Sequence, residues 1–380
     1  MYICDYLEEA RDFVNHKEYK EIPYSKRNWG NSWHSLTSYR GKLKPSIAHM
    51  LVKKFTSNGD IVLDPMCGVG TIPFEANLQG RIGVGNDLSK LAYVVTRAKL
   101  NPPKLDDALS ELAHLDRYIE LIKNEFSGNS EVKKFGLNRP IAEYYHPETL
   151  KEILAARKYF MDNRMDNSRA LVMSCILHIL HGNRPYALSR HSHPLTPYAP
   201  TGDYVYKNLI EHTRNKIDLM YGRKDFHDWR AGSALNLDAL NIESVLSANS
   251  VDEIITSPPF SSSFRFYTQN WLRLWFSGWT ESEFGSAKNT YFDDKQNKNM
   301  DIYIPFFKVC HEVLKPNGKM ILHLGKSTMT DMSKELTKRC NNYFNVIYTG
   351  AESITNAENF GIRDVGATTE HQFLFLQNKS

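Results

Sequence analysis

The sequence predicts an α/β fold with a mostly parallel sheet and a helical lobe inserted between its second and third strands. The first observation is an apolar strand at 61–63 that is followed by a glycine turn, a helix and a second strand at 82–84. The second is an apolar run at 251–255 that ends at two consecutive prolines. The third is the length, since 380 residues suffice for one large domain or two moderate ones. Ligands of such sheets lie at the carboxyl ends of the strands.

The periodicity of apolar residues predicts the remaining elements. Expected helices lie at 6–16, 45–55, 71–80, 91–100, 147–160, 169–180, 204–224 and 306–314, with a helical pattern running through much of 104–167. Further strands are expected at 319–324, 344–349 and 371–376. Trp271, Trp275 and Trp279 recur at helical spacing, and we expect them in the core rather than on a base-stacking surface.

The turn after the first strand has the chemistry of a nucleotide site. Its sequence is Asp64-Pro65-Met66-Cys67-Gly68-Val69-Gly70-Thr71. Gly68 and Gly70 allow a tight turn and a close approach of the backbone to a ligand. Thr71 is expected to cap the following helix. The second strand leads to Asp87, where a carboxylate can accept both hydroxyl protons of a ribose. The unit therefore predicts a nucleotide-binding domain.

A dinucleotide is the competing ligand, and the turn fits it poorly. The third glycine of the G-x-G-x-x-G pattern is missing, and Pro73 stands in its place. Asp64 would repel a pyrophosphate and would instead attract a cationic ligand, such as the sulfonium and ammonium groups of S-adenosyl-L-methionine. A glycine turn without any ligand is the remaining interpretation, and the second acid at Asp87 argues against it.

The run at 251–255 leads into Thr256-Ser257-Pro258-Pro259-Phe260. Two consecutive prolines forbid both a helix and a strand ladder, so the chain leaves the sheet in a stiff, extended turn. A hydroxyl, proline carbonyls and an aromatic ring then lie at the end of a strand, where they suit a planar, amine-bearing group such as a nucleobase. A proline-stiffened loop is the ordinary interpretation of Pro-Pro alone. The glycine turn upstream favours the functional one.

Together, these two motifs resemble those of the amino-methyltransferases. DPMCGVGT is similar to the cofactor motif of that family, and TSPPF is similar to its catalytic motif, which has Ser, Asp or Asn before Pro-Pro and an aromatic residue. The serine form resembles the DNA N4-cytosine enzymes. Phe260 stands where tyrosine is commoner, and Met66 where Phe is common. The resemblance implies a class I S-adenosylmethionine-dependent methyltransferase: a Rossmann-like, seven-stranded, mostly parallel sheet.

The resemblance also implies which residues hold the cofactor and the target base. The expected cofactor-binding residues are Asp64, Pro65, Cys67, Gly68, Gly70, Thr71, Asp87, Leu88, Ser233 and Lys42. Ser257 and the carbonyl of Pro258 would accept hydrogen bonds from the target amine, while Pro259 completes the motif and Phe260 stacks on the base. No covalent cysteine intermediate is needed, so Cys67 belongs to the cofactor turn.

Domain boundaries follow from the extent of the resemblance, which covers the sheet core. Residues 34–100 and 225–380 are expected to form the catalytic domain, and residues 1–33 an N-terminal extension. Residues 101–224 are expected to form a helical insertion that contacts double-stranded DNA as a target-recognition region. The loop at 182–200 is long, proline-broken and rich in basic and aromatic residues, which is typical of functional or disordered loops. Candidate DNA contacts are Arg184, Arg190, His191, Tyr267 and Asn270.

Three other functions remain open. Adenine-N6 methylation uses the same machinery, although those enzymes more often carry Asp where this chain has Ser257. An RNA base amino-methyltransferase is the second, because the glycine turn also resembles that of guanine-N2 enzymes. The third is a DNA-binding module that keeps the fold without catalysis. In a DNA enzyme the target base must first be extruded from the duplex.

Composition limits the classes of function further. The five cysteines form no Cys-x-x-Cys pair, which indicates a reducing compartment and argues against structural zinc or disulfides. His178 and His181 have helical spacing, but no cysteine or carboxylate pair joins them, so we expect no metal. The sequence contains neither a long apolar run nor a basic leader. We therefore expect a cytoplasmic location, in a bacterial-type cytosol or nucleoid, and no membrane partner. The net charge of +4 permits nucleic acid binding. A cognate restriction endonuclease is a second candidate partner.

Overall fold

The computed structural model describes residues 3–26, 29–39, 41–126, 130–137, 139–180, 205–227, 229–261, 266–353 and 368–380. Its strands are β1 (Ile61–Asp64), β2 (Ile82–Asn86), β3 (Ser233–Leu235), β4 (Val251–Thr256), β5 (Leu314–Ser327), β6 (Phe344–Ser353) and β7 (Thr368–Asn378). They form one sheet in the order β3-β2-β1-β4-β5-β7-β6. Neighbours are parallel from β3 to β5, and β7 is antiparallel to both β5 and β6. The expected α/β fold with a seven-stranded, mostly parallel sheet is confirmed.

Side chains of the central strands alternate between two cores, because successive residues of a strand point to opposite faces. Val62 and Ile255 belong to the core that α1 (Ile3–His16), α2 (Pro45–Phe55) and α3 (Thr71–Leu78) help to build. Leu63 and Ile254 belong to the core beneath α14 (Tyr303–Val313) and α15 (Met332–Cys340). Both faces of the sheet are thus covered, and apolar residues of β1 and β4 are buried on both of them.

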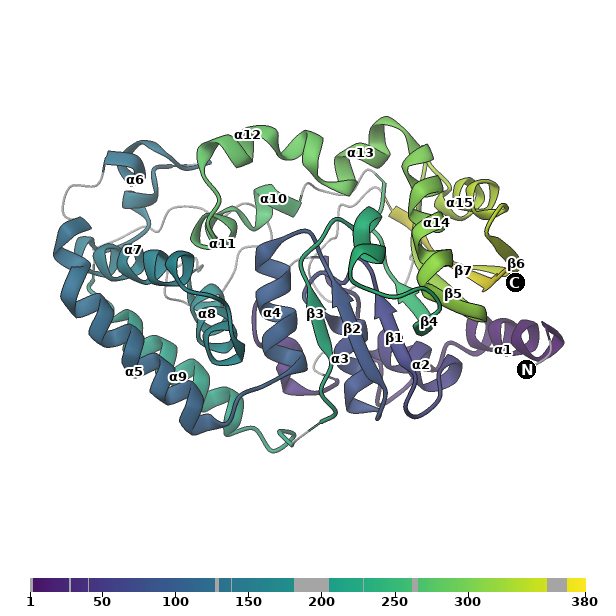
Figure 1. Ribbon diagram of the computed structural model, residues 1–380, viewed down its shortest axis with the longest axis horizontal. Coiled ribbons are helices and arrows are strands. Elements are labelled where there is room, and N and C mark those ends of the chain that lie inside the picture. The colour runs from purple at the N-terminus through teal and green to yellow at the C-terminus, as the bar shows by residue number, and fades with distance from the viewer. Residues whose placement is uncertain are drawn as a thin grey trace.

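A helical lobe leaves the sheet between β2 and β3 and lies at the end of the molecule opposite both termini (Figure 1). After α4 (Lys90–Leu100) it comprises α5 (Leu105–Ile122), α6 (Ser130–Lys134), α7 (Pro147–Asp162), α8 (Asn167–Ile179) and α9 (Leu209–Tyr221). Helix α8 packs against α4, so the lobe and the sheet layer share a core. Short 3₁₀-helices are η1 (Glu18–Lys20), η2 (Ser32–Ser35), η3 (Lys123–Phe126), η4 (Ile141–Glu143), η5 (Ala239–Ser244) and η6 (Met300–Ile302).

The chain returns to the lobe after β4. This segment forms α10 (Phe266–Gln269), α11 (Trp271–Phe276), α12 (Glu281–Thr290) and α13 (Phe292–Lys298). Trp271 and Trp275 are fully buried, in the same core as the apolar residues of α7 and α8. The expected boundaries placed this segment in the catalytic domain, and its tryptophan face lies in the core that the lobe shares with α4.

Three local expectations differ from the structure. Gly70, rather than Thr71, is the cap residue of α3, and the buried Thr71 hydroxyl has no hydrogen-bond partner among the residues that the structure describes. Strand β5 begins at Leu314 rather than at 319, and its pairing with β4 shifts register in this additional part. Helix α9 begins at Leu209 rather than near 204, because the side chain of Asn208 accepts the Glu211 amide at 2.7 Å and caps the helix there.

Candidate active site

Two strand tips that are far apart in the sequence meet at the carboxyl edge of the sheet. Strands β1 and β4 are parallel neighbours. Thr256, the last residue of β4, donates a hydrogen bond of 2.7 Å from Oγ1 to Oδ1 of Asp64, the last residue of β1. Ser257 directly follows Thr256. The structure therefore brings the glycine turn and the proline turn to one place.

The glycine turn between β1 and α3 is shaped by backbone conformations that favour glycine. Gly68 has a φ of 51° and Gly70 a φ of 68°. A Cβ atom at Gly70 would lie 2.8 Å from the side chain of Thr96. The Gly68 amide donates to Oδ2 of Asp87 at 2.9 Å. The acid that was expected to receive a ribose thus also holds the turn in place.

Other contacts within the turn are structural. The Cys67 amide donates to the Asn86 carbonyl at 2.8 Å, and the Asn86 side chain donates to the Pro65 carbonyl at 3.0 Å. Burial raises the pKa of the Cys67 thiol well above its usual range, so the thiol is protonated and is a poor nucleophile. Lys99, which is fully buried, donates to the Val69 carbonyl at 2.6 Å, and burial lowers its pKa to about 7.

Three carboxyl groups gather at this edge of the sheet: Asp64 is buried, and Asp87 and Asp293 are half-buried. Burial raises the pKa of Asp64 and of Asp87 to about 7, and that of Asp293, in the first turn of α13, to about 6. Burial raises the pKa of the half-buried Tyr39 hydroxyl, and the charges of Asp87 and Asp293 raise it further. Buried carboxylates are stabilised by a cation. The residues present therefore fit the positively charged S-adenosyl-L-methionine, which Asp64 and the glycine turn would hold.

The proline turn after β4 packs against β5. Ser257 Oγ lies 3.1 Å from Nδ1 of His323. The Phe260 ring lies against the backbone of Gly325, where a Cβ atom would be 2.6 Å from the ring. Its centroid is 5.5 Å from that of His323. The hydroxyl and the aromatic ring of the motif are thus both positioned by the same strand.

The two prolines of the motif differ in their surroundings. Pro258 is buried, and the carbonyl of Pro259 accepts a hydrogen bond of 2.8 Å from Nε2 of Gln296 in α13. Helix α13 therefore contacts the proline turn through Gln296, and it also carries Asp293. Sequence reasoning missed this helix, because nothing in its local pattern points to a site.

Ser233 is placed differently from the expectation that it approaches the cofactor. It is the first residue of β3, opposite Val84 in β2, and so lies at the amino end of that strand. Asn236 follows the carboxyl end of β3, and its side chain donates to the carbonyls of Asp87 and Leu88 at 2.8 and 3.0 Å. The rule that selected Asp87, a polar residue just after a strand, could have found Asn236.

The segment before α2 carries one residue that the sequence analysis missed. The ring of Tyr39 lies against the glycine turn, 3.4 Å from the position of a Cβ atom on Gly68. The expected cofactor residue Lys42 is instead bonded within its own segment, with Nζ donating to the His34 carbonyl at 2.8 Å. Burial lowers its pKa.

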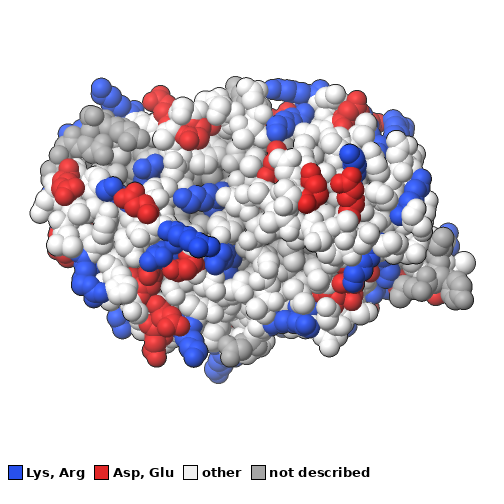
Figure 2. All heavy atoms as spheres, viewed as in Figure 1, with Lys and Arg blue, Asp and Glu red and all other residues white. Residues whose placement is uncertain are grey.

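The expected DNA contacts are only partly described. Arg184, Arg190 and His191 lie outside the described residues. Tyr267 and Asn270 are 6% and 2% exposed, because they pack in the lobe core beside the tryptophan helix. Neither presents a surface to a duplex here. On the face shown in Figure 2, basic and acidic side chains are interspersed, without an extended field of one sign.

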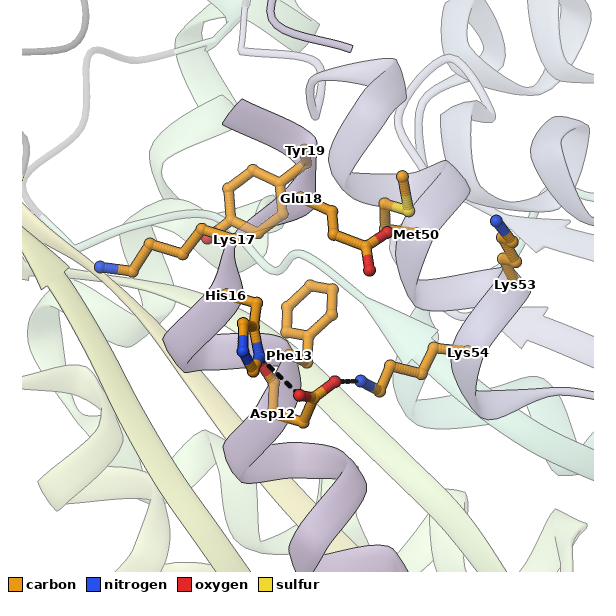
Figure 3. Close-up of a pocket in the computed structure, with 9 residues that line it drawn as sticks. All are labelled: Asp12, Phe13, His16, Lys17, Glu18, Tyr19, Met50, Lys53 and Lys54. Carbon is orange, nitrogen blue, oxygen red and sulfur yellow. Dashed lines mark hydrogen bonds and ion pairs between the residues drawn. The ribbon is translucent and has the colours of Figure 1, made fainter. Parts of the chain in front are cut away.

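A cavity of about 220 Å³ lies between α1, η1 and α2, away from the strand tips (Figure 3). Phe13 and Met50 line it, and Lys54 pairs with Asp12 at its rim. No residue of either motif lines it. Within the described part of the chain, no group of three or more His, Cys, Asp or Glu side chains could hold a metal ion. None of the helices described here combines the length and the hydropathy that a bilayer span requires.

Residues 34–108 match a family model described as "RMKL-like, methyltransferase domain". The match contains the glycine turn, Asp87 and Tyr39. The sheet around it is seven-stranded and mostly parallel, as the resemblance implied. Residues 34–108 are therefore similar to a methyltransferase domain, and they lie in a chain with a seven-stranded, mostly parallel α/β sheet.

Several solved structures are similar to the chain at low identity. TrmN from Thermus thermophilus is 13% identical with a TM-score of 0.38; the match covers 94% of this chain and 54% of TrmN, so the chain spans about half of that protein. The rRNA methyltransferase aviRa from Streptomyces viridochromogenes is 10% identical with a TM-score of 0.32; the match covers 90% of this chain and 88% of aviRa. The PH0226 protein from Pyrococcus horikoshii is 12% identical with a TM-score of 0.34; the match covers 96% of this chain and 99% of PH0226. A search of curated protein sequences found no match. Structural similarities at such low identity and TM-score do not identify a substrate.

Proposed function

We propose that the chain transfers a methyl group from S-adenosyl-L-methionine to the N4 amine of a cytosine extruded from double-stranded DNA. The observation that carries this proposal is the hydrogen bond between Thr256 and Asp64, which joins the catalytic motif to the cofactor motif. The bound cofactor supplies an electrophilic methyl: the amine nitrogen gains the methyl carbon, the sulfur keeps the electron pair of the broken bond, and the nitrogen releases one proton to solvent.

The residues of the proline turn would prepare the amine for attack. Its nitrogen is a weak nucleophile because the lone pair delocalises into the ring. Ser257 Oγ and the carbonyl of Pro258 would accept hydrogen bonds from the amine protons and favour a tetrahedral nitrogen. Phe260 would stack on the base, which contributes on the order of 1–3 kcal/mol. Alignment of the reacting atoms would supply several kcal/mol more.

The DNA would be held by the lobe. Helix α8 of the lobe packs against α4 beside the sheet. The candidate contacts Arg184, Arg190 and His191 belong to the same insertion in the sequence. Arginine can hold phosphates with two parallel hydrogen bonds. The lobe is therefore proposed as the target-recognition region.

The identity of the methylated base tests this proposal. Duplex DNA and RNA are incubated separately with the protein and cofactor that carries an isotope in its methyl group, and the nucleosides are analysed by mass spectrometry. We expect labelled N4-methylcytosine from DNA. The Ser257→Ala variant should lose about 10²-fold in kcat while binding the cofactor as before. Labelled N6-methyladenine instead would assign the adenine reaction, and retained DNA binding with unchanged methyl transfer in Ser257→Ala would contradict the role of that residue.

An RNA base amine is the second candidate substrate. The family match over 34–108 favours it, because that region contains the glycine turn that also resembles guanine-N2 enzymes. The same experiment decides between the two, since label found only in RNA nucleosides would replace the DNA proposal. Ser257 favours DNA cytosine, because the RNA enzymes usually carry Asn or Asp before Pro-Pro.

A further inference from the structure

His323 is a buried histidine of β5 whose two ring nitrogens have different surroundings. Nδ1 lies 3.1 Å from Ser257 Oγ, at the tip of the neighbouring strand β4. Nε2 is buried and has no hydrogen-bond partner among the described residues. The side chain is 3% exposed. Because buried polar atoms are almost always paired, a histidine placed in this way beside a catalytic motif needs an explanation.

The plane of this imidazole is fixed by rings from β7 and from the proline turn. It stacks on His371 with a centroid distance of 4.9 Å and an interplanar angle of 23°. The rings of Phe373 and Phe260 lie 5.1 and 5.5 Å away. Burial, and then the neighbouring His371, lower the pKa of His323 well below its usual range. The imidazole is therefore neutral, with one nitrogen that donates and one that accepts.

The hydroxyl of Ser257 can either donate a hydrogen bond to the target amine or accept one from it, and the difference matters for the proposed reaction. A serine hydroxyl has one proton and two lone pairs, and it rotates to suit its partners. If the hydroxyl donated its proton to the target amine, that hydrogen bond would occupy the nitrogen lone pair that must attack the methyl group. If it accepts protons from the amine, that lone pair stays available.

We propose that His323 is a positioning residue that orients the Ser257 hydroxyl: its Nδ1 accepts the proton of Ser257, which leaves both lone pairs of Oγ for the target amine. The inference rests on the proposed function. The ring contacts hold Nδ1 in place, so the hydroxyl is oriented before the base arrives. The imidazole proton then resides on Nε2. His323 acts through Ser257 and touches neither the cofactor nor the base in this account.

The experiment compares two variants at this position. His323→Phe keeps an aromatic ring for stacking and removes the acceptor. His323→Asn offers a hydrogen-bonding atom near the place of Nδ1. We expect His323→Phe to lower kcat by about 10²-fold, with KM for the nucleic acid and the cofactor affinity nearly unchanged, and His323→Asn to recover much of that loss. His311→Phe is the control, because it removes a 2.6 Å contact between Nδ1 of a half-buried histidine and Oδ1 of Asn378, outside both motifs.

A double-mutant cycle separates positioning from a general loss of packing. If His323 acts through the hydroxyl, His323→Phe has no further effect on kcat in a Ser257→Ala background. An equal loss in both backgrounds would overturn the proposal, as would full activity in His323→Phe. Thermal unfolding of each variant shows whether it is folded.

The tautomer gives a readout that does not depend on activity. In protein labelled with ¹⁵N at histidine, the resonances that disappear in His323→Asn belong to this ring. Their shifts should show a proton on Nε2 and a bare Nδ1, and the opposite tautomer would contradict the inference. If the wild-type chain methylates no nucleic acid, the proposed function fails by itself, and the tautomer still shows whether the imidazole accepts from Ser257.

Discussion

Thr256 and Asp64 are 192 positions apart in the sequence, and yet Oγ1 of Thr256 lies 2.7 Å from Oδ1 of Asp64. Both side chains are buried. The hydrogen bond lowers the pKa of Asp64, which burial raises more strongly, so the hydroxyl favours the charged form of the acid. One contact thus joins the two motifs and adjusts the charge that would meet the cofactor.

The Thr256→Val variant tests this contact, because valine keeps the shape of threonine and removes the donor. Without the hydrogen bond the pKa of Asp64 rises further above 7, and a smaller fraction of the acid is ionised at neutral pH. We expect about tenfold weaker cofactor binding at pH 7 and a smaller difference at pH 8.5, measured by titration calorimetry. Equal weakening at both pH values would show that packing, rather than charge, is responsible.

Binding of S-adenosyl-L-methionine should strengthen as the pH rises from 6 to 8. Asp64 and Asp87 have pKa values of about 7 in the free protein, and a cation favours their ionised forms. Binding at pH 6.5 should therefore release protons, which calorimetry in buffers of different ionisation enthalpy detects. Asp87→Asn should flatten the dependence. An affinity that is independent of pH would contradict the charge argument.

The same acids should make the free protein less stable at higher pH. Their folded pKa values exceed the unfolded value of 3.8, so the folded state binds more protons between pH 4 and 7. Their contribution is fully present below the unfolded pKa and is lost as the pH rises through 7. Urea unfolding of the free protein at pH 5.5 and 8 measures it, and Asp87→Asn should reduce the difference. A saturating cofactor should reduce it as well.

Gly70→Ala tests the conformation of the glycine turn. The residue has a φ of 68°, and the new Cβ would lie 2.8 Å from Thr96. We expect a loss of about 1–3 kcal/mol in the free energy of unfolding and weaker cofactor binding. Gly285→Ala in α12 is the control, because no atom lies within 4 Å of its Cβ position, and it should be neutral or slightly stabilising. Equal effects of the two substitutions would contradict the prediction.

Gly325→Ala tests whether Phe260 holds the base. The added Cβ would lie 2.6 Å from the Phe260 ring, so the ring must move. We expect kcat/KM for the nucleic acid to fall about tenfold, because base–aromatic stacking contributes on the order of 1–3 kcal/mol, while cofactor affinity stays the same. Methylation kinetics and calorimetry measure the two quantities. A loss of cofactor affinity of the same size would place the effect in the cofactor turn instead.

Much of the candidate site could be predicted because many of its residues lie in two short segments that directly follow strands. Asp64, Gly68 and Asp87 follow strands whose apolar residues identify them, and the structure joins them by hydrogen bonds. The tryptophan stripe was correctly expected in the core. The lobe was expected between β2 and β3, where α5 to α9 are found.

The rest could not be predicted, because it depends on which segments the fold brings together. His323, Tyr39 and Asp293 lie in a strand, a loop and a helix whose local patterns are ordinary. Each reaches the site through a neighbour that is remote in the chain: His323 through Ser257, Tyr39 through Gly68 and Asp293 through Asp87. The position of Ser233 at the amino end of β3 has the same origin, since the register of β3 against β2 decides which of its residues is at the carboxyl edge.

The sequence by itself determined the local elements: apolar periodicity, glycines in the left-handed region and a pair of prolines depend only on neighbouring residues. Tertiary structure alone decided that β1 lies next to β4 and β4 next to β5, and hence that Ser257 meets His323 and Thr256 meets Asp64. The physical reason is that strand order results from burying both faces of the whole sheet at once, and no segment contains that information.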